Sequence, residues 1–137
     1  MNATAHLTSA VREASPFRSP PRVRVLADAH HAGEALALAE ALEVCGAEAD
    51  VRVGDDLATA AGTPDAVVVD VGWVTGEMAD HCRGLGPHPV VVAVAEADDW
   101  EGRERARTAG YDLVVTRPLS AEKLLVCLGE QLPGLLA

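Results

Sequence analysis

Three charged residues stand directly after apolar stretches of the sequence, where they could do chemistry together. Asp28 follows Val-Arg-Val-Leu-Ala, Asp70 follows Ala-Val-Val-Val, and Arg117 follows Leu-Val-Val-Thr. Two neighbouring carboxylates can share a hard cation such as Mg²⁺, which prefers oxygen ligands. An aspartate beside a metal ion can in turn accept a phosphoryl group. The competing structural interpretation is that Asp28 caps a helix and Asp70 only begins a loop.

The elements that would position these residues alternate along the chain as strand and helix. Unbroken apolar runs at 66–69 and 90–95 are typical of central strands that are buried on both faces. Apolar residues recur at helical spacing from Ala35 to Cys45, and Gly46 ends this helix. The other expected elements are strands over 23–28, 49–53 and 113–115, and helices over 55–61, 77–85, 98–109 and from Ser120 onward.

This alternation predicts an α/β fold. Five strand–helix repeats indicate a doubly wound, all-parallel sheet of five strands with five flanking helices. In such sheets the working site lies beyond the carboxyl ends of the strands, where the strand order reverses. Asp28, Asp70 and Arg117 all stand at such ends, so the topology predicts that they meet.

Composition indicates one globular domain. The chain has 137 residues, of which 49% are hydrophobic, and this is enough for a core without disulfides or metals. Its three cysteines, Cys45, Cys82 and Cys127, are widely spaced and form no C-x-x-C pair. The spacing argues against a zinc site and against a secreted disulfide framework. We therefore expect a cytoplasmic protein.

The charge of the chain is acidic and unevenly distributed. The formal net charge is −10. Residues 1–24 hold four arginines and one glutamate, a net charge of +3, which leaves −13 for residues 25–137. A phosphate backbone would repel so acidic a body, which argues against nucleic-acid binding.

The first 21 residues differ from the rest of the chain. They are polar and end in Pro20-Pro21, which predicts a flexible tail over 1–21 before a single domain over 22–137. Within the tail, only residues 8–13 suggest a short helix. No apolar run approaches the roughly 20 residues of a membrane span, and no signal-peptide pattern is present.

Two segments resemble the receiver domains of bacterial two-component response regulators, of the chemotaxis-regulator type. Residues 64–71, Pro-Asp-Ala-Val-Val-Val-Asp-Val, resemble the family's stretch that ends in the phosphoacceptor aspartate, here Asp70. Residues 109–120, Ala-Gly-Tyr-Asp-Leu-Val-Val-Thr-Arg-Pro-Leu-Ser, resemble the segment with lysine-proline before the last helix, and Arg117 takes the lysine position. The resemblance covers about residues 22–137.

The resemblance implies both a fold and a site. The fold is flavodoxin-like, with the strand order 2-1-3-4-5. By resemblance Asp70 is the phosphoacceptor, Arg117 takes the place of the lysine that contacts the acyl phosphate, and Mg²⁺ is held by Asp28, Asp70 and the backbone carbonyl of Gly72. The implied partner is a sensor histidine kinase or a phosphotransfer protein. The implied function is signalling in a two-component system or phosphorelay, not enzymatic turnover.

Several supporting residues depart from the family's pattern. Ala27 stands where receivers carry a second acid, and Val94 stands where a hydroxyl residue ends the fourth strand. Valine donates no side-chain hydrogen bond, and arginine is bulkier and forked where lysine is a point charge. We therefore expect an atypical or pseudo-receiver with weak or absent Mg²⁺ binding and slow or absent phosphorylation. Arg117 could instead neutralise Asp70 through a charge-assisted hydrogen bond.

The output of such a module would come from protein contacts. The chain ends soon after the last helix, so we expect no attached DNA-binding domain. Family analogy points to the fourth helix, fifth strand and fifth helix as the contact surface, which would include Trp100 and Tyr111. The same surface could mediate a homodimer.

A second interpretation is cobalamin binding. The motif Asp28-x-His30-x-x-Gly33 fits the D-x-H-x-x-G signature of cobalamin-binding domains, in which the histidine is the lower ligand to cobalt. The segments after the third and fourth strands, however, lack that family's S-x-L and paired glycines. Under the receiver interpretation, His30 and His31 are expected to form a solvated pair in the first loop.

Overall fold

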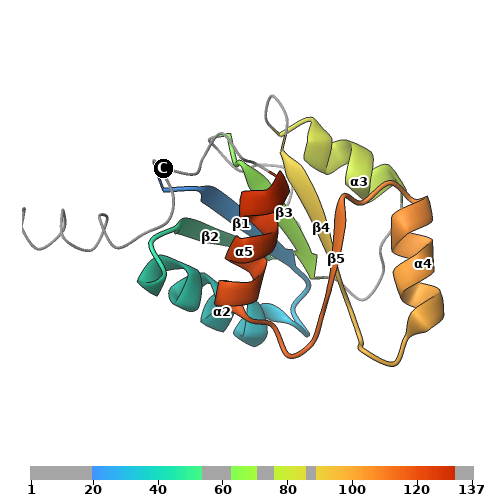
Figure 1. The fold of residues 1–137 in the computed structure, drawn as a ribbon, viewed down its shortest axis with the longest axis horizontal. Coiled ribbons are helices and arrows are strands. Elements are labelled where there is room, and N and C mark those ends of the chain that lie inside the picture. The colour runs from blue at the N-terminus through green and yellow to red at the C-terminus, as the bar shows by residue number, and fades with distance from the viewer. Residues whose placement is uncertain (1–19, 54–62, 71–75, 86–88, 132–137) are drawn as a thin grey trace, which may run out of the picture.

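Five strands form one parallel sheet in the order β2-β1-β3-β4-β5, as predicted (Figure 1). The computed structural model describes residues 20–53, 63–70, 76–85 and 89–131. The helix expected over 55–61 lies outside them. The strands are β1 (Arg22–Ala27), β2 (Glu48–Val53), β3 (Ala66–Asp70), β4 (Val90–Ala95) and β5 (Leu113–Thr116). The described helices are α2 (Ala32–Val44), α3 (Gly76–Arg83), α4 (Trp100–Thr108) and α5 (Ala121–Gln131).

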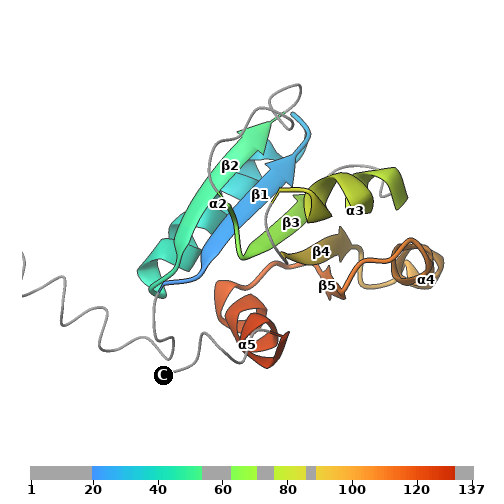
Figure 2. The ribbon, with the colours of Figure 1, turned by 90° about the horizontal axis from the view of Figure 1, so that it is seen from above.

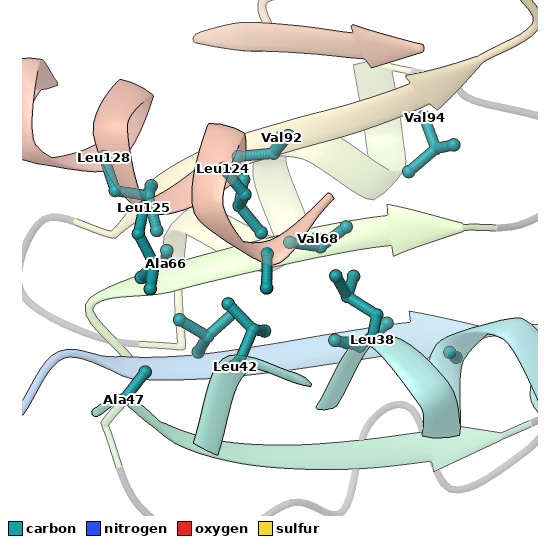
Figure 3. Close-up of a cluster of buried hydrophobic side chains, with 14 of the residues drawn as sticks. Leu38, Leu42, Ala47, Ala66, Val68, Val92, Val94, Leu124, Leu125 and Leu128 are labelled. Carbon is teal, nitrogen blue, oxygen red and sulfur yellow. The ribbon is translucent and has the colours of Figure 1, made fainter. Parts of the chain in front are cut away.

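The helices cover both faces of the sheet (Figure 2). On one face, Leu42 of α2 and Leu124 of α5 pack with Val68 of β3 (Figure 3). On the other face, Cys82 of α3 and Ala106 of α4 belong to a second apolar cluster. Because successive strand residues point to opposite faces, a strand covered on both sides must be apolar throughout. The unbroken apolar runs of β3 and β4 meet this requirement.

The helix α4 is held mainly at its two ends. Its buried residues are only Gly102 and Ala106, which agrees with the poor apolar face of this segment. At the start, the Asp99 carboxylate accepts a hydrogen bond of 2.9 Å from the Gly102 amide. At the end, the Arg83 guanidinium of α3 donates to the Gly110 carbonyl. Within the described ranges, no helix combines the length and the apolar character needed to cross a bilayer.

The predicted contact surface needs one correction. Trp100 is 64% exposed, but Tyr111 is only 5% exposed and belongs to the apolar cluster beneath α3 and α4. The Tyr111 amide donates to the Ala106 carbonyl, which draws the residue in under the end of α4. The prediction that Tyr111 contributes to a partner surface is therefore wrong.

Candidate functional site

Asp70 is a charged residue at the end of an entirely buried strand. Its side chain has no exposed area, and its neighbour in register on β1 is the equally buried Ala27. A carboxylate removed from water is costly unless it is paired and hydrogen-bonded. The position of Asp70 therefore requires a cationic partner.

Arg117 supplies that partner. It follows β5 directly, as Asp70 ends β3, so the parallel sheet brings both residues to the same edge. The Arg117 Nη2 donates a hydrogen bond of 2.6 Å to Asp70 Oδ1, and Nη1 makes a longer contact of 3.5 Å with Oδ2. Contacts between ionised partners are among the stronger hydrogen bonds in proteins. The predicted approach of Arg117 to Asp70 is present in the structure.

Two further carboxylates hold the same guanidinium. The Arg117 Nε donates a hydrogen bond of 2.8 Å to Glu96, the residue after β4. The Nη1 forms an ion pair with Glu34, in the first turn of α2. All three guanidinium nitrogens thus have carboxylate partners, from three different parts of the fold. Sequence reasoning did not assign Glu34 or Glu96 to the site, although Glu96 stands at a strand end just as Asp70 does.

Asp28 is engaged locally. Its Oδ1 accepts a hydrogen bond of 3.0 Å from the His31 amide and lies 2.7 Å from His31 Nδ1. The N-cap position of α2 is His31, which makes no side-chain cap hydrogen bond, so the expectation that Asp28 caps the helix is wrong; Asp28 instead holds the turn that precedes α2. His30 is exposed, as predicted, but His31 is half-buried against Asp28. The expectation of a solvated pair therefore holds for His30 and only in part for His31, whose side chain is 23% exposed.

The described residues do not fit a Mg²⁺ ion well. Both oxygens of Asp70 face Arg117, and one oxygen of Asp28 is taken by His31. Within the described part of the chain, no group of three or more His, Cys, Asp and Glu side chains could hold a metal ion. Gly72, the third predicted ligand, lies outside the described residues.

Burial also shifts the proton affinity of the site. Burial raises the pKa of Asp70 from 3.8 to about 6; His31 opposes this shift, whereas Asp28 and Glu96 add to it. Burial lowers the pKa of Arg117, and Asp28 opposes that change. A guanidinium remains charged in proteins. At neutral pH the site therefore holds an ionised Asp70 beside a charged Arg117.

The raised pKa of Asp70 predicts a pH-dependent stability. Between about pH 4 and pH 6 the folded state keeps a proton on Asp70 that the unfolded state has released, so the free energy of unfolding falls as the pH rises through this window. A shift of about 2 pKa units corresponds to about 3 kcal/mol. The variant Asp70→Asn carries no titrating group at this position. Its free energy of unfolding relative to the native chain should rise by about 2 kcal/mol between pH 4 and pH 7, because at pH 4 the unfolded chain has already released part of the proton.

Urea unfolding of both chains at these two pH values measures the change. A relative stability that stays constant with pH would show that Asp70 titrates like an ordinary exposed carboxyl group.

Several solved structures are similar to this chain in fold. No protein-family model matches the sequence, and no curated protein sequence matches it. A response regulator receiver protein from Burkholderia phymatum is 25% identical, with a TM-score of 0.65 over 85% of this chain and 98% of its own. A CheY-like receiver domain protein from Methanospirillum hungatei is 20% identical, with a TM-score of 0.64 over 85% of this chain and 96% of its own.

A third similar structure is a response regulator protein from Burkholderia pseudomallei with a phosphorylated aspartic acid, a calcium ion and citrate. It is 18% identical, with a TM-score of 0.62 over 83% of this chain and 71% of its own. The cobalamin-binding alternative gains no support from these three structures. The predicted sheet order and the structural similarity agree. The chain therefore has the fold of a response regulator receiver domain.

Proposed function

We propose that the chain is a receiver-type signalling module in which Arg117 holds the phosphoacceptor position, Asp70, in one fixed state. The observation that carries this proposal is the 2.6 Å contact between Arg117 Nη2 and Asp70 Oδ1. The remaining nitrogens of the guanidinium are occupied by Glu34 and Glu96. An aspartate that must accept a phosphoryl group needs a free oxygen, and here both oxygens face the guanidinium.

The residues around Asp70 also lack what a two-state switch requires. Val94 is buried at 7% exposure near the end of β4, and its side chain offers no hydroxyl that could follow a phosphoryl oxygen. Ala27 contributes no charge beside Asp28. A ligand shifts a conformational equilibrium only by as much as it distinguishes two states. Without a hydroxyl at position 94 and a second acid at position 27, a phosphoryl group on Asp70 would distinguish the two states only weakly.

The functional consequence is a constitutive binding surface. The partner class we propose is a sensor histidine kinase or phosphotransfer protein in the cytoplasm, with no enzymatic turnover by this chain. The contact surface would consist of α4, β5 and α5, with Trp100 as its exposed aromatic anchor. Exposed tryptophan side chains are typical of interface hot spots. A homodimer through the same elements is part of this proposal.

The similar protein with a phosphorylated aspartic acid shows that this fold is compatible with the modification. In the present chain we therefore attribute the proposed absence of phosphorylation to particular residues, not to the topology of the fold. Mg²⁺ binding should be weak for the same reason, because Asp28 and Asp70 already have partners.

Phosphorylation of the native chain tests the proposal. The chain is incubated with Mg²⁺ and acetyl phosphate, and its intact mass is measured beside that of Asp70→Asn as the control. We expect no stable phosphoryl group on either chain, because the Asp70 carboxylate is held by Arg117. Stoichiometric addition to the native chain, absent from Asp70→Asn, would contradict a fixed state.

A further inference from the structure

The helix α2 is apolar on its outer side as well as on its buried side. Leu36 is 55% exposed and Val44 is 83% exposed, and Ala37 and Ala41 lie exposed on the same side of the helix. Exposed apolar side chains that gather on one side of a helix mark a surface that another segment can cover. The described residues leave this outer face, defined by Leu36, Ala37, Ala41 and Val44, open to solvent.

Acidic side chains accompany the outer face. Glu40 lies among its residues and Glu43 lies beside it, both exposed. Neither forms an ion pair with any residue of the described ranges. A segment that matches the outer face should therefore combine apolar and cationic side chains.

The N-terminal segment of this chain has that composition and enters the domain next to α2. It contains Leu7, Val11 and Phe17 together with Arg12 and Arg18. Leu7 and Val11 are four residues apart, the spacing of neighbours on one helix face.

The attachment point of this segment is set by backbone hydrogen bonds. The Pro21 carbonyl accepts a hydrogen bond of 2.9 Å from the Glu48 amide, and the Ala47 amide donates to Leu42 in the last turns of α2. Residue 21 is thereby joined to the first residue of β2, four residues along the chain from Val44. A segment that leaves the domain at this point starts at the same end of the sheet as the C-terminal end of α2, which carries Val44.

We propose that residues 1–19 cover the outer face of α2. The 13 residues of α2 span about 20 Å, a length that 19 residues can match in either a helical or an extended form. Residues 132–137 are a weaker candidate because they hold no cationic side chain to pair with Glu40 and Glu43. The proposal concerns a surface separate from Asp70 and does not depend on the proposed function.

Trypsin tests the proposal on the full chain, because it cleaves after Arg12 and Arg18 within the segment. The rates of cleavage at these two sites are followed by mass spectrometry for the native chain, Leu36→Ser and Val44→Asp. Cleavage follows the population of the open form, so both variants should be cut about tenfold faster than the native chain. The double variant Glu40→Gln with Glu43→Gln should also be cut faster. Asp80→Asn removes an exposed carboxylate of α3, on the opposite face of the sheet, and should leave the rates unchanged.

Equal and rapid cleavage of all variants would overturn the proposal, because the segment would then be free in the native chain. Sedimentation velocity tests whether a second copy of the chain covers the outer face in place of residues 1–19. A native dimer that Val44→Asp dissociates, without any change in cleavage at Arg12 and Arg18, would assign the outer face to a second copy and would also overturn the proposal. Since all substituted positions are exposed, loss of folding is not expected, and thermal unfolding of each variant verifies this.

Discussion

Replacing Arg117 by alanine is expected to lower the free energy of unfolding by about 3–5 kcal/mol at neutral pH. The substitution leaves the fully buried Asp70 without its cation. It also leaves Glu34 and Glu96 near the same point with no positive charge between them. Removing one member of a buried ion pair is costly because an uncompensated charge remains. Urea unfolding at pH 7 measures the loss.

The pH dependence and a matched control make this prediction specific. Without Arg117 the pKa of Asp70 should rise above 6, so the penalty should shrink as the pH falls towards 6, because the variant takes up a proton on Asp70 before the native chain does, and it should level off below about pH 6. Arg107 forms an exposed ion pair of 3.1 Å with Glu104, so Arg107→Ala should change the stability by at most about 0.5 kcal/mol. If Arg117→Ala is as mild as Arg107→Ala, the buried pair does not stabilise the domain.

The second large effect is the recovery of phosphorylation. The triple variant Ala27→Asp, Val94→Thr and Arg117→Lys introduces the residue types of the receiver pattern at these three positions. It should turn a chain that acetyl phosphate does not modify into one that carries a phosphoryl group on Asp70. In that reaction an Asp70 oxygen attacks phosphorus and acetate leaves. Lysine is a point charge without the fork that engages both oxygens of Asp70, so the substitution frees one oxygen to react.

Mass spectrometry in the presence of Mg²⁺ measures the recovery, and the triple variant combined with Asp70→Asn is the control. Ala27 is fully buried, so a new aspartate there could prevent folding. The single variant Arg117→Lys avoids this risk and should gain part of the modification. A folded triple variant that stays unmodified would show that the change at Arg117 is not what blocks the site.

The sheet could be predicted from the sequence because the apolar residues of its central strands form unbroken runs. The residues Ala66–Val69 are buried at every position, and so unbroken an apolar stretch is typical of a strand covered on both faces. The helical repeat of Ala35, Leu38 and Leu42 was equally informative, since all three are buried in α2. In both cases local sequence and tertiary burial point to the same element.

The site was predictable only in part. Asp70 and Arg117 could be paired in advance because each stands at a strand end of the same parallel sheet. Glu34 contacts Arg117 from another element, and such a contact depends on helix placement that spacing does not specify. The prediction that Tyr111 lies on the contact surface was wrong for a similar reason. The sequence does not show to which face a residue just before a strand will turn.

The state of Asp70 in the native chain can be observed directly by amide NMR with Mg²⁺ and beryllofluoride, which imitates a phosphoryl group on an aspartate. If Arg117 holds Asp70 as the 2.6 Å contact indicates, the amide signals of Asp70, α4 and β5 should keep their positions when the reagent is added. Saturable shifts of these signals in the native chain, absent from Asp70→Asn, would show that Asp70 is free to react and would contradict the fixed state.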